Sequence, residues 1–178
     1  MSNNDPVWEM MRSTSQEHVL QEPLLASFLH ATILNHDSLE DALSYHLASK
    51  LGSPTASALL IREIIEDALK SSDTISQAMR ADIVATYERD SACECLSTPF
   101  LFYKGFHALQ AYRVAHWLWQ QDRKQLACFL QNHISMAFAV DIHPAATIGK
   151  GIMLDHATGI VIGETAIVED NVSIMQSV

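Results

Sequence analysis

The strongest chemical signal in this sequence is a histidine that follows two aspartates near the carboxyl-terminal end. His156 comes directly after Asp155 and fifteen residues after Asp141. Imidazole titrates near neutral pH, so a histidine can take the proton from a hydroxyl group that attacks an acyl donor. A carboxylate on the other ring nitrogen fixes the tautomer and stabilises the imidazolium that forms. The pattern predicts a general base at His156, but spacing alone does not show contact with Asp141.

A hexapeptide repeat must position these residues. Counting in sixes through the last stretch meets only aliphatic or small side chains, at Ile142, Ile148, Leu154, Ile160, Ala166, Val172 and Val178. This period predicts a parallel β-helix with three flat faces, in which three hexapeptides close one coil of eighteen residues. An ordinary buried strand region would explain local pairs of apolar residues but not seven positions in register. On this count His156 lies three residues short of stacking over Asp141, roughly 10 Å along a strand.

Metal chemistry is the main alternative for the histidines of the repeat. A γ-class carbonic anhydrase also uses a hexapeptide β-helix, so His143 and His156 can be interpreted as two zinc ligands. Such a site needs a third nitrogen ligand, and the repeat offers none. Cys93 and Cys95 have no second cysteine pair at ligand spacing, and we expect thiols without a role in the loop from Asp90 to Ser97. The sequence therefore predicts no metal.

Helices are expected before the repeat. Start signals are Asp5-Pro6, Pro23, Ser38, Ser53-Pro54 and Thr98-Pro99, with further helices from about Thr74 to Tyr87 and from Arg123 to Ala139. Gly105 lies inside an apolar helical pattern that continues to Trp119, where it costs about 1 kcal/mol relative to alanine. We therefore expect a kink or a close approach at Gly105. The fold class is α+β, with a helical domain over residues 1–140 and the β-helix domain over residues 141–178.

Composition narrows the range of partners. The chain of 178 residues carries 11 basic and 21 acidic side chains, a net charge of −10. This charge argues against nucleic acid and against an anionic membrane surface. The polar start lacks the regions of a signal peptide, and no apolar run is long enough to span a bilayer. Three cysteines suit a reducing compartment, so we expect a cytoplasmic protein.

Three motifs resemble the serine acetyltransferase family. They are Asp141-Ile-His-Pro, the run from Ile148 to Gly159 (IGKGIMLDHATG), and Gly163-Glu-Thr-Ala, and the segment from Ser97 to Arg113 is also similar to the helical region of that family. The resemblance covers nearly the whole chain. It implies a left-handed β-helix and transfer of an acetyl group from acetyl-CoA to the hydroxyl of L-serine, which gives O-acetylserine for cysteine biosynthesis.

The resemblance also assigns residues. It implies a catalytic dyad of His156 and Asp141, in which His156 is the general base, and substrate contacts from Asp90 and Asp155 to the amino acid. Carboxylates suit this second role because serine brings an ammonium group. No permanent cofactor is implied, and acetyl-CoA is a co-substrate. Members of the family continue through further coils, so we expect this sequence to be truncated, with most acetyl-CoA contacts beyond Val178 and with doubtful activity.

The resemblance implies partners as well. Cysteine should compete with serine as a feedback inhibitor, and the subunits should form a trimer or a dimer of trimers. The complex with cysteine synthase depends on the far carboxyl terminus of the family and is not expected from this chain. Two other functions stay open: acetyl transfer to another hydroxyl substrate, and a non-catalytic oligomerisation module.

Overall fold

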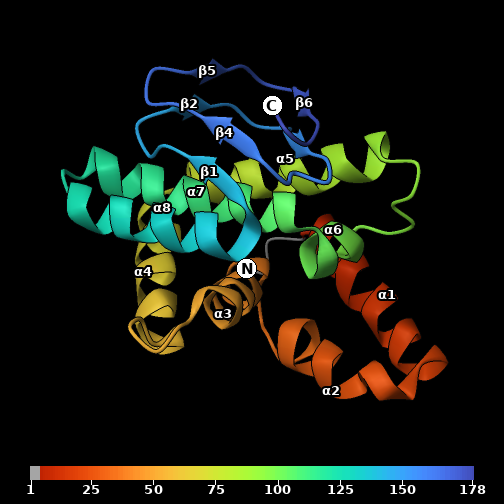
Figure 1. Cartoon of the computed structure of the whole chain (residues 1–178). Helices are drawn as coiled ribbons and strands as arrows, with labels where there is room; N and C mark the ends of the chain where they lie inside the picture. Colours follow the sequence, from red (N-terminus) through yellow and green to blue (C-terminus); the bar gives the residue numbers. More distant parts are fainter. Residues whose placement is uncertain (1–4) are drawn as a thin grey trace.

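The computed structural model describes residues 5–178, in which helices come first and short parallel strands follow (Figure 1). The helices are α1 (Pro6–Gln21), η1 (Pro23–Leu25), α2 (Ala26–Leu29), η2 (His30–Leu34), α3 (Leu39–Leu51), α4 (Ala58–Ser71), α5 (Asp73–Arg89), α6 (Ser97–Phe102), α7 (Lys104–Gln120) and α8 (Lys124–Phe138). The strands are β1 (Val140–Ile142), β2 (Thr147–Ile148), β3 (Met153–Leu154), β4 (Ile160–Ile162), β5 (Ile167–Val168) and β6 (Ser173–Ile174). The α+β fold class is confirmed. The first residues of the polar start, residues 1–4, lie outside the described residues.

Two of the predicted helix starts, Asp5-Pro6 and Ser38, have capping side chains, whereas the helix expected from Ser53-Pro54 begins later, at Ala58, with Ser57 as its cap. The Asp5 carboxylate accepts a hydrogen bond from the Trp8 amide at 3.2 Å, with Pro6 in the first helical position. Ser38 accepts from the Asp41 amide at 3.2 Å and begins α3. The segment opened by Pro23 is less regular than expected, because it begins as a 3₁₀ turn and ends as a π-helical turn.

Helix α7 lies at the centre of the fold. It packs against α4, α5 and α8 on the helical side and against β1 and β3 on the other. Figure 1 shows the strands stacked over α5, α7 and α8, with α1 to α3 on the opposite side of these helices. One hydrophobic core runs from Trp8 in α1 to Ile162 in β4, so the apolar interior is continuous past residue 140. Among the described residues, no helix is long and apolar enough to cross a membrane.

The helix predicted from Thr98-Pro99 is interrupted two residues before Gly105, where a kink or close approach was expected. Tyr103 has extended dihedral angles (φ −90°, ψ 109°) and separates α6 from α7. Gly105 is the second residue of α7, and the expected close approach is present there, because the Leu154 carbonyl oxygen lies 2.1 Å from where a Cβ would stand. The kink belongs to Tyr103 and the close approach to Gly105.

The strands form the first coils of a left-handed parallel β-helix. β1 pairs with β4, β2 with β5 and β3 with β6, all in parallel, so each pair belongs to one of three faces. Buried aliphatic side chains from Val140, Ile142, Ile160 and Ile162 fill the space inside the coils. This arrangement confirms the interpretation of the hexapeptide period as a β-helix.

The predicted stacking is wrong by two residues in the second coil. Ile142 pairs with Ile162, Ile148 with Val168 and Leu154 with Ile174, whereas the unbroken period placed Ile160, Ala166 and Val172 at those positions. The first coil therefore has twenty residues instead of eighteen, as the pairing of Val140 with Ile160 shows. The physical reason is the corner between β3 and β4, which carries two extra residues. This corner contains His156.

Candidate active site

The corner from Asp155 to Gly159 projects His156 away from the β-helix. His156 and Ala157 have left-handed backbone conformations, with φ of 52° and 62°, and Gly159 follows with φ of 79°. A non-glycine residue in this region costs roughly 1–2 kcal/mol, and such strain concentrates at functional sites. The Ala139 carbonyl holds the end of the corner by accepting from the Gly159 amide at 2.8 Å. We will call residues 155–159 the wide corner.

The first turn of α7 packs directly against the wide corner. The missing side chain at Gly105 lets the helix approach the Leu154 carbonyl and the Ala157 methyl group. Lys104 reaches across and donates a hydrogen bond from Nζ to Oγ1 of Thr158. The corner is therefore braced by a helix that comes fifty residues earlier in the sequence.

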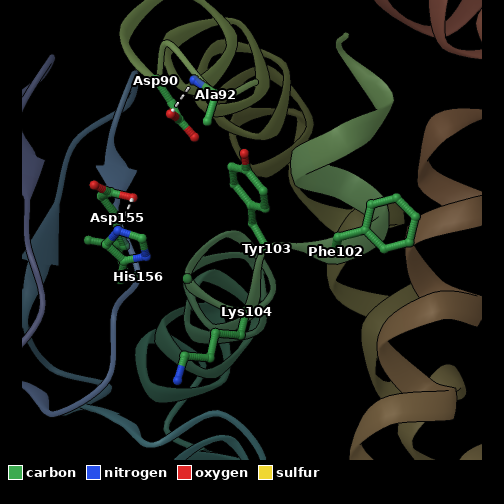
Figure 2. A pocket seen from close by; sticks show the side chains of 9 residues that line it. Asp90, Ala92, Phe102, Tyr103, Lys104, Asp155 and His156 are labelled. Carbon is green, nitrogen blue, oxygen red and sulfur yellow. Dashed lines mark hydrogen bonds and ion pairs between the residues drawn. The ribbon is translucent and has the colours of Figure 1, made fainter. Parts of the chain in front are cut away.

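A cleft of about 410 Å³ opens between the wide corner, the start of α7 and the loop after α5. Figure 2 shows Asp155 and His156 on one side of it and Asp90 and Tyr103 facing them. Its lining consists of Asp90, Ala92, Phe102, Tyr103, Lys104, Gly105, Leu154, Asp155 and His156. Three of the four predicted site residues, from two distant parts of the sequence, thus line one cavity.

His156 is free to act on a ligand in this cleft. Its side chain is 75% exposed, and its Nε2 lies 3.9 Å from Oδ1 of Asp155, whose side chain is 23% exposed. That distance permits an ion pair when the imidazole is protonated but is too long for a hydrogen bond. The exposed ring nitrogens of His156 can therefore meet the hydroxyl group of a ligand in the cleft.

Asp90 is fixed by the end of α5. Its amide donates to the Thr86 carbonyl, and its Oδ1 accepts from the Ala92 amide at 2.8 Å. The hydroxyl of Tyr103 points toward this carboxylate (Figure 2). Burial, followed by the Asp90 and Asp155 carboxylates, raises the pKa of Tyr103 above its ordinary range. The phenol therefore stays neutral beside two acids.

Arg89 attaches the end of α5 to the coils. Its Nη1 donates to the Gly151 carbonyl at 3.0 Å and to Ser173 Oγ at 3.3 Å, and its Nη2 donates to Asn171 Oδ1 at 3.4 Å. Because Gly151 belongs to the first coil and Ser173 to the second, the guanidinium spans both. Asp90 is the next residue, so this contact fixes the distance between Asp90 and the β-helix.

A buried network joins α5, α7 and the first coil. Asp82 is fully buried, and its Oδ2 accepts from Arg113 Nη2 at 2.7 Å, from Arg113 Nε at 3.0 Å and from Gln110 Nε2 at 2.9 Å. Its Oδ1 accepts from the Ile152 amide at 2.9 Å, one residue before β3. Arg113 also donates to the Gly149 carbonyl at 2.7 Å. Burial raises the pKa of Asp82, and the Arg113 guanidinium opposes this shift.

Asp141 lies outside the cleft. It is half-buried in β1, and its Oδ1 accepts from Gln131 Nε2 of α8 at 2.7 Å. Within residues 5–178, no hydrogen bond or ion pair joins Asp141 to His156. The carboxylate nearest to His156 is Asp155, and the role of Asp141 in a dyad stays a prediction.

His143 has a local structural role. Its Nδ1 accepts from the Ala145 amide at 3.1 Å, and its ring packs edge-on against Trp119. In the part of the chain that the structure describes, no group of three or more His, Cys, Asp or Glu residues is placed to hold a metal ion. The loop thiols Cys93 and Cys95 bond locally, Cys93 Sγ to the Cys95 carbonyl and Cys95 Sγ to Ser97 Oγ.

Sequence reasoning missed Tyr103, Lys104 and Arg89. Only Gly105 gave a signal, because a glycine in a helix marks a place where another group approaches the backbone. The residues on either side of such a glycine belong to the same contact. That argument would have pointed to Lys104 but not to Tyr103 or Arg89.

Comparisons with known proteins agree on one family. The family model described as "Serine acetyltransferase, N-terminal" matches residues 7–111. The curated serine acetyltransferases of Salmonella typhimurium and Haemophilus influenzae are 55% and 56% identical over 172 residues, which is 97% of this chain. The chain spans 63% and 64% of the length of these two relatives.

Solved structures are similar over the same stretch. The serine acetyltransferase of Vibrio cholerae has a TM-score of 0.95 and 57% identity, and the match covers 97% of this chain and 67% of that one. A serine acetyltransferase in complex with CoA has a TM-score of 0.95 and 56% identity, covering 96% and 72%. A complex with cysteine has a TM-score of 0.94 and 56% identity, covering 96% and 71%.

Proposed function

This chain belongs to the serine acetyltransferase family, and we propose that it acts in the transfer of an acetyl group from acetyl-CoA to the hydroxyl of L-serine. The products are O-acetylserine and free CoA. The observation that carries this proposal is the cleft in which His156, with Asp155 beside it, faces the Asp90 carboxylate. A base for a hydroxyl and two acids for an ammonium group are the groups that this reaction needs.

His156 is the proposed general base. The serine oxygen bonds to the thioester carbonyl carbon while His156 takes the hydroxyl proton, and the carbon–sulfur bond then breaks. The imidazolium returns the proton to the CoA sulfur, so no metal or other reactant is needed. Asp155, 3.9 Å away, stabilises the imidazolium between the two steps.

Asp90 and Asp155 are proposed to bind the serine ammonium. Both line the cleft, Asp90 at the end of α5 and Asp155 at the wide corner (Figure 2). Charge-assisted hydrogen bonds from an ammonium to carboxylates are about twice as strong as neutral ones, so an amino acid is preferred over a plain alcohol. Cysteine offers the same ammonium, and we propose that it inhibits at the same place. A related enzyme has been solved with cysteine.

Asp141 is proposed as the orienting member of a dyad with His156, on the resemblance to the family. Gln131 is its present partner, and the exposed imidazole of His156 has room to turn. The proposed CoA site involves residues of the β-helix, and a related enzyme has been solved with CoA. Residues 1–140 and 141–178 are proposed as helical and β-helix domains.

We propose that the subunits associate as a trimer or a dimer of trimers. Apolar side chains are exposed on the outside of the coils and on α8, at Val161, Ile167 and Met136. Association with further copies of the chain would cover such side chains. The three cysteines are free thiols, which supports a cytoplasmic location.

The test is a CoA-release assay with serine and acetyl-CoA. It uses this chain and a chimera in which the part of the Haemophilus influenzae relative that follows the matched residues is joined after Val178. In the active form, His156→Ala should lower turnover by at least about 10²-fold, the usual loss when a general base is removed, with little change in serine binding. Asp141→Asn should give a milder loss because the imidazole remains. Turnover of His156→Ala near the unsubstituted level would refute the assignment.

A further inference from the structure

The junction between α6 and α7 places Tyr103 in the wall of the cleft. Its amide donates to the Pro99 carbonyl at 3.2 Å, and its own carbonyl accepts from the His107 amide at 3.1 Å. The side chain is half-buried, and its hydroxyl points toward Asp90 (Figure 2). Tyr103 thus joins two helices through its backbone and faces the acids with its side chain.

Two buried histidines hold this junction in place. His107 Nε2 donates to the Phe100 carbonyl at 2.6 Å, and His46 Nε2 donates to the Leu101 carbonyl at 3.3 Å. Carbonyls at the end of a helix lack partners within the helix, so these contacts satisfy the last turn of α6. The position of Tyr103 is therefore set by the folded chain before any ligand arrives.

The polar side chains of the cleft keep acceptor positions that can bind a ligand. One oxygen of Asp90 accepts from the Ala92 amide, and the Tyr103 hydroxyl lies toward the carboxylate. A phenol that donates its proton to a carboxylate keeps its oxygen lone pairs as acceptors. The raised pKa of Tyr103 keeps that proton in place at neutral pH. The cleft then offers three acceptor groups: Asp90, Asp155 and the Tyr103 oxygen.

We propose that Tyr103 is a substrate-binding residue that orients Asp90 and supplies the third acceptor for the ammonium group of the amino acid. This inference rests on the proposed function, because it assigns an amine to the cleft. An ammonium has three N–H donors, and each donor left unpaired in a partly buried site weakens binding. Two carboxylates and one phenol oxygen match that number. A hydroxyl compound without an amine brings only one uncharged O–H donor to these three acceptors.

The experiment measures ligand binding to this 178-residue chain, labelled with nitrogen-15, by chemical-shift titration. The probes are L-serine, ethanolamine, which keeps the amine alone, and 3-hydroxypropionate, which lacks it. Serine and ethanolamine should shift the amides of Asp90, Asp155 and Tyr103, and 3-hydroxypropionate should not. Ethanolamine makes the test independent of any group that binds the serine carboxylate.

Tyr103→Phe keeps the ring and removes only the hydroxyl. It should weaken the binding of both amines about tenfold, the usual effect of one hydrogen bond to a charged group. Tyr45→Phe is the matched control, because Tyr45 packs against His36 in another part of the fold. In the Asp90→Asn background the Tyr103→Phe effect should shrink, since part of it acts through that carboxylate.

Equal ethanolamine affinity in Tyr103→Phe and the unsubstituted chain would overturn the role of Tyr103 and leave the proposed function standing. Equal affinity for 3-hydroxypropionate and ethanolamine would refute the amine site itself, and the role of Tyr103 with it. A loss for Tyr103→Phe that is the same with and without Asp90→Asn would retain Tyr103 as a direct acceptor but overturn its orienting role.

Discussion

Gly105→Ala should destabilise the fold although alanine is the better helix former. A Cβ at residue 105 would stand 2.1 Å from the Leu154 carbonyl oxygen and 3.0 Å from the Ala157 Cβ, where ordinary contacts begin at 3.4 Å. The nearest atom belongs to the backbone of the strand that ends at the wide corner, so no flexible side chain can move aside. Either the first turn of α7 or the wide corner must shift by more than 1 Å.

The change in the free energy of unfolding for Gly105→Ala is the difference between a gain in helix propensity and the cost of the clash. Alanine gains about 1 kcal/mol over glycine inside a helix, and at the second residue of α7 the gain is smaller. Inserting a methyl group into a packed contact costs about 1–3 kcal/mol, and the upper part of that range applies to a backbone clash. A net loss of about 1–2 kcal/mol corresponds to a fall in Tm of roughly 5 °C for a chain of this size.

The assay is thermal unfolding followed by circular dichroism, with amide chemical shifts as a second readout. Gly163→Ala is the matched control, because nothing lies within 4 Å of its Cβ position. Gly105→Ala should also shift the amides of Asp155 and His156, since these residues lie on the displaced corner. An unchanged or higher Tm for Gly105→Ala, with native shifts at His156, would refute the close-approach argument.

Three further predictions concern the acids and the buried histidines. Asp82→Asn leaves the Arg113 guanidinium buried without its countercharge and should lower the free energy of unfolding, measured in urea, by about 3–5 kcal/mol. Asp67→Asn breaks an exposed ion pair with Arg123 and should lower it by less than about 1 kcal/mol. Similar losses in the two variants would contradict the role of the buried network. Burial lowers the pKa of His46 to about 4 and that of His107 to about 3. Histidine in the unfolded chain has a pKa near 6.5, so at intermediate pH the unfolded chain binds protons that the folded chain does not. The free energy of unfolding should therefore fall as the pH drops from about 6.5 to 4. His107→Phe should flatten that profile in urea unfolding at pH 7 and 4.5, and an equally steep profile would count against the assignment. Asp90→Ala, measured in the active chimera, should raise the KM for serine and weaken inhibition by cysteine by similar factors. The reason is that both ligands offer an ammonium group to the same carboxylate. Weaker inhibition with an unchanged KM would show that serine and cysteine bind at separate sites.

The local features of this fold could be predicted because each depends on neighbours in the sequence. Asp5-Pro6 and Ser38 mark helix starts through hydrogen bonds that span three residues. The period of six identifies a β-helix because each coil must return an aliphatic residue to the interior. Gly105 indicated a close approach, although the sequence did not name the Leu154 carbonyl as the approaching group.

The wide corner escaped prediction because the apolar pattern continues through it. Ile160 is buried, as the period requires, but it stacks with Val140 and leaves Ile162 to pair with Ile142. Because β4 has aliphatic residues at both 160 and 162, it fits a first coil of eighteen residues as well as one of twenty, so the sequence does not reveal the two-residue shift. The motif Asp155-His156 carried the missing information, since a polar pair in an aliphatic repeat needs a place outside the coil.

The relative placement of the candidate site residues depends on side chains that meet over long separations. Asp82 bonds to Arg113, 31 residues later, and to the Ile152 amide, 70 residues later, and no local pattern connects them. Asp82 and Asp90 lie on one helix, so the network fixes where the end of α5 stands. The Ile152 amide lies three residues before Asp155, so the same network also fixes where β3 ends. The two carboxylates proposed to bind the substrate ammonium are thus both positioned from one buried carboxylate, and loosening Asp82 should separate them.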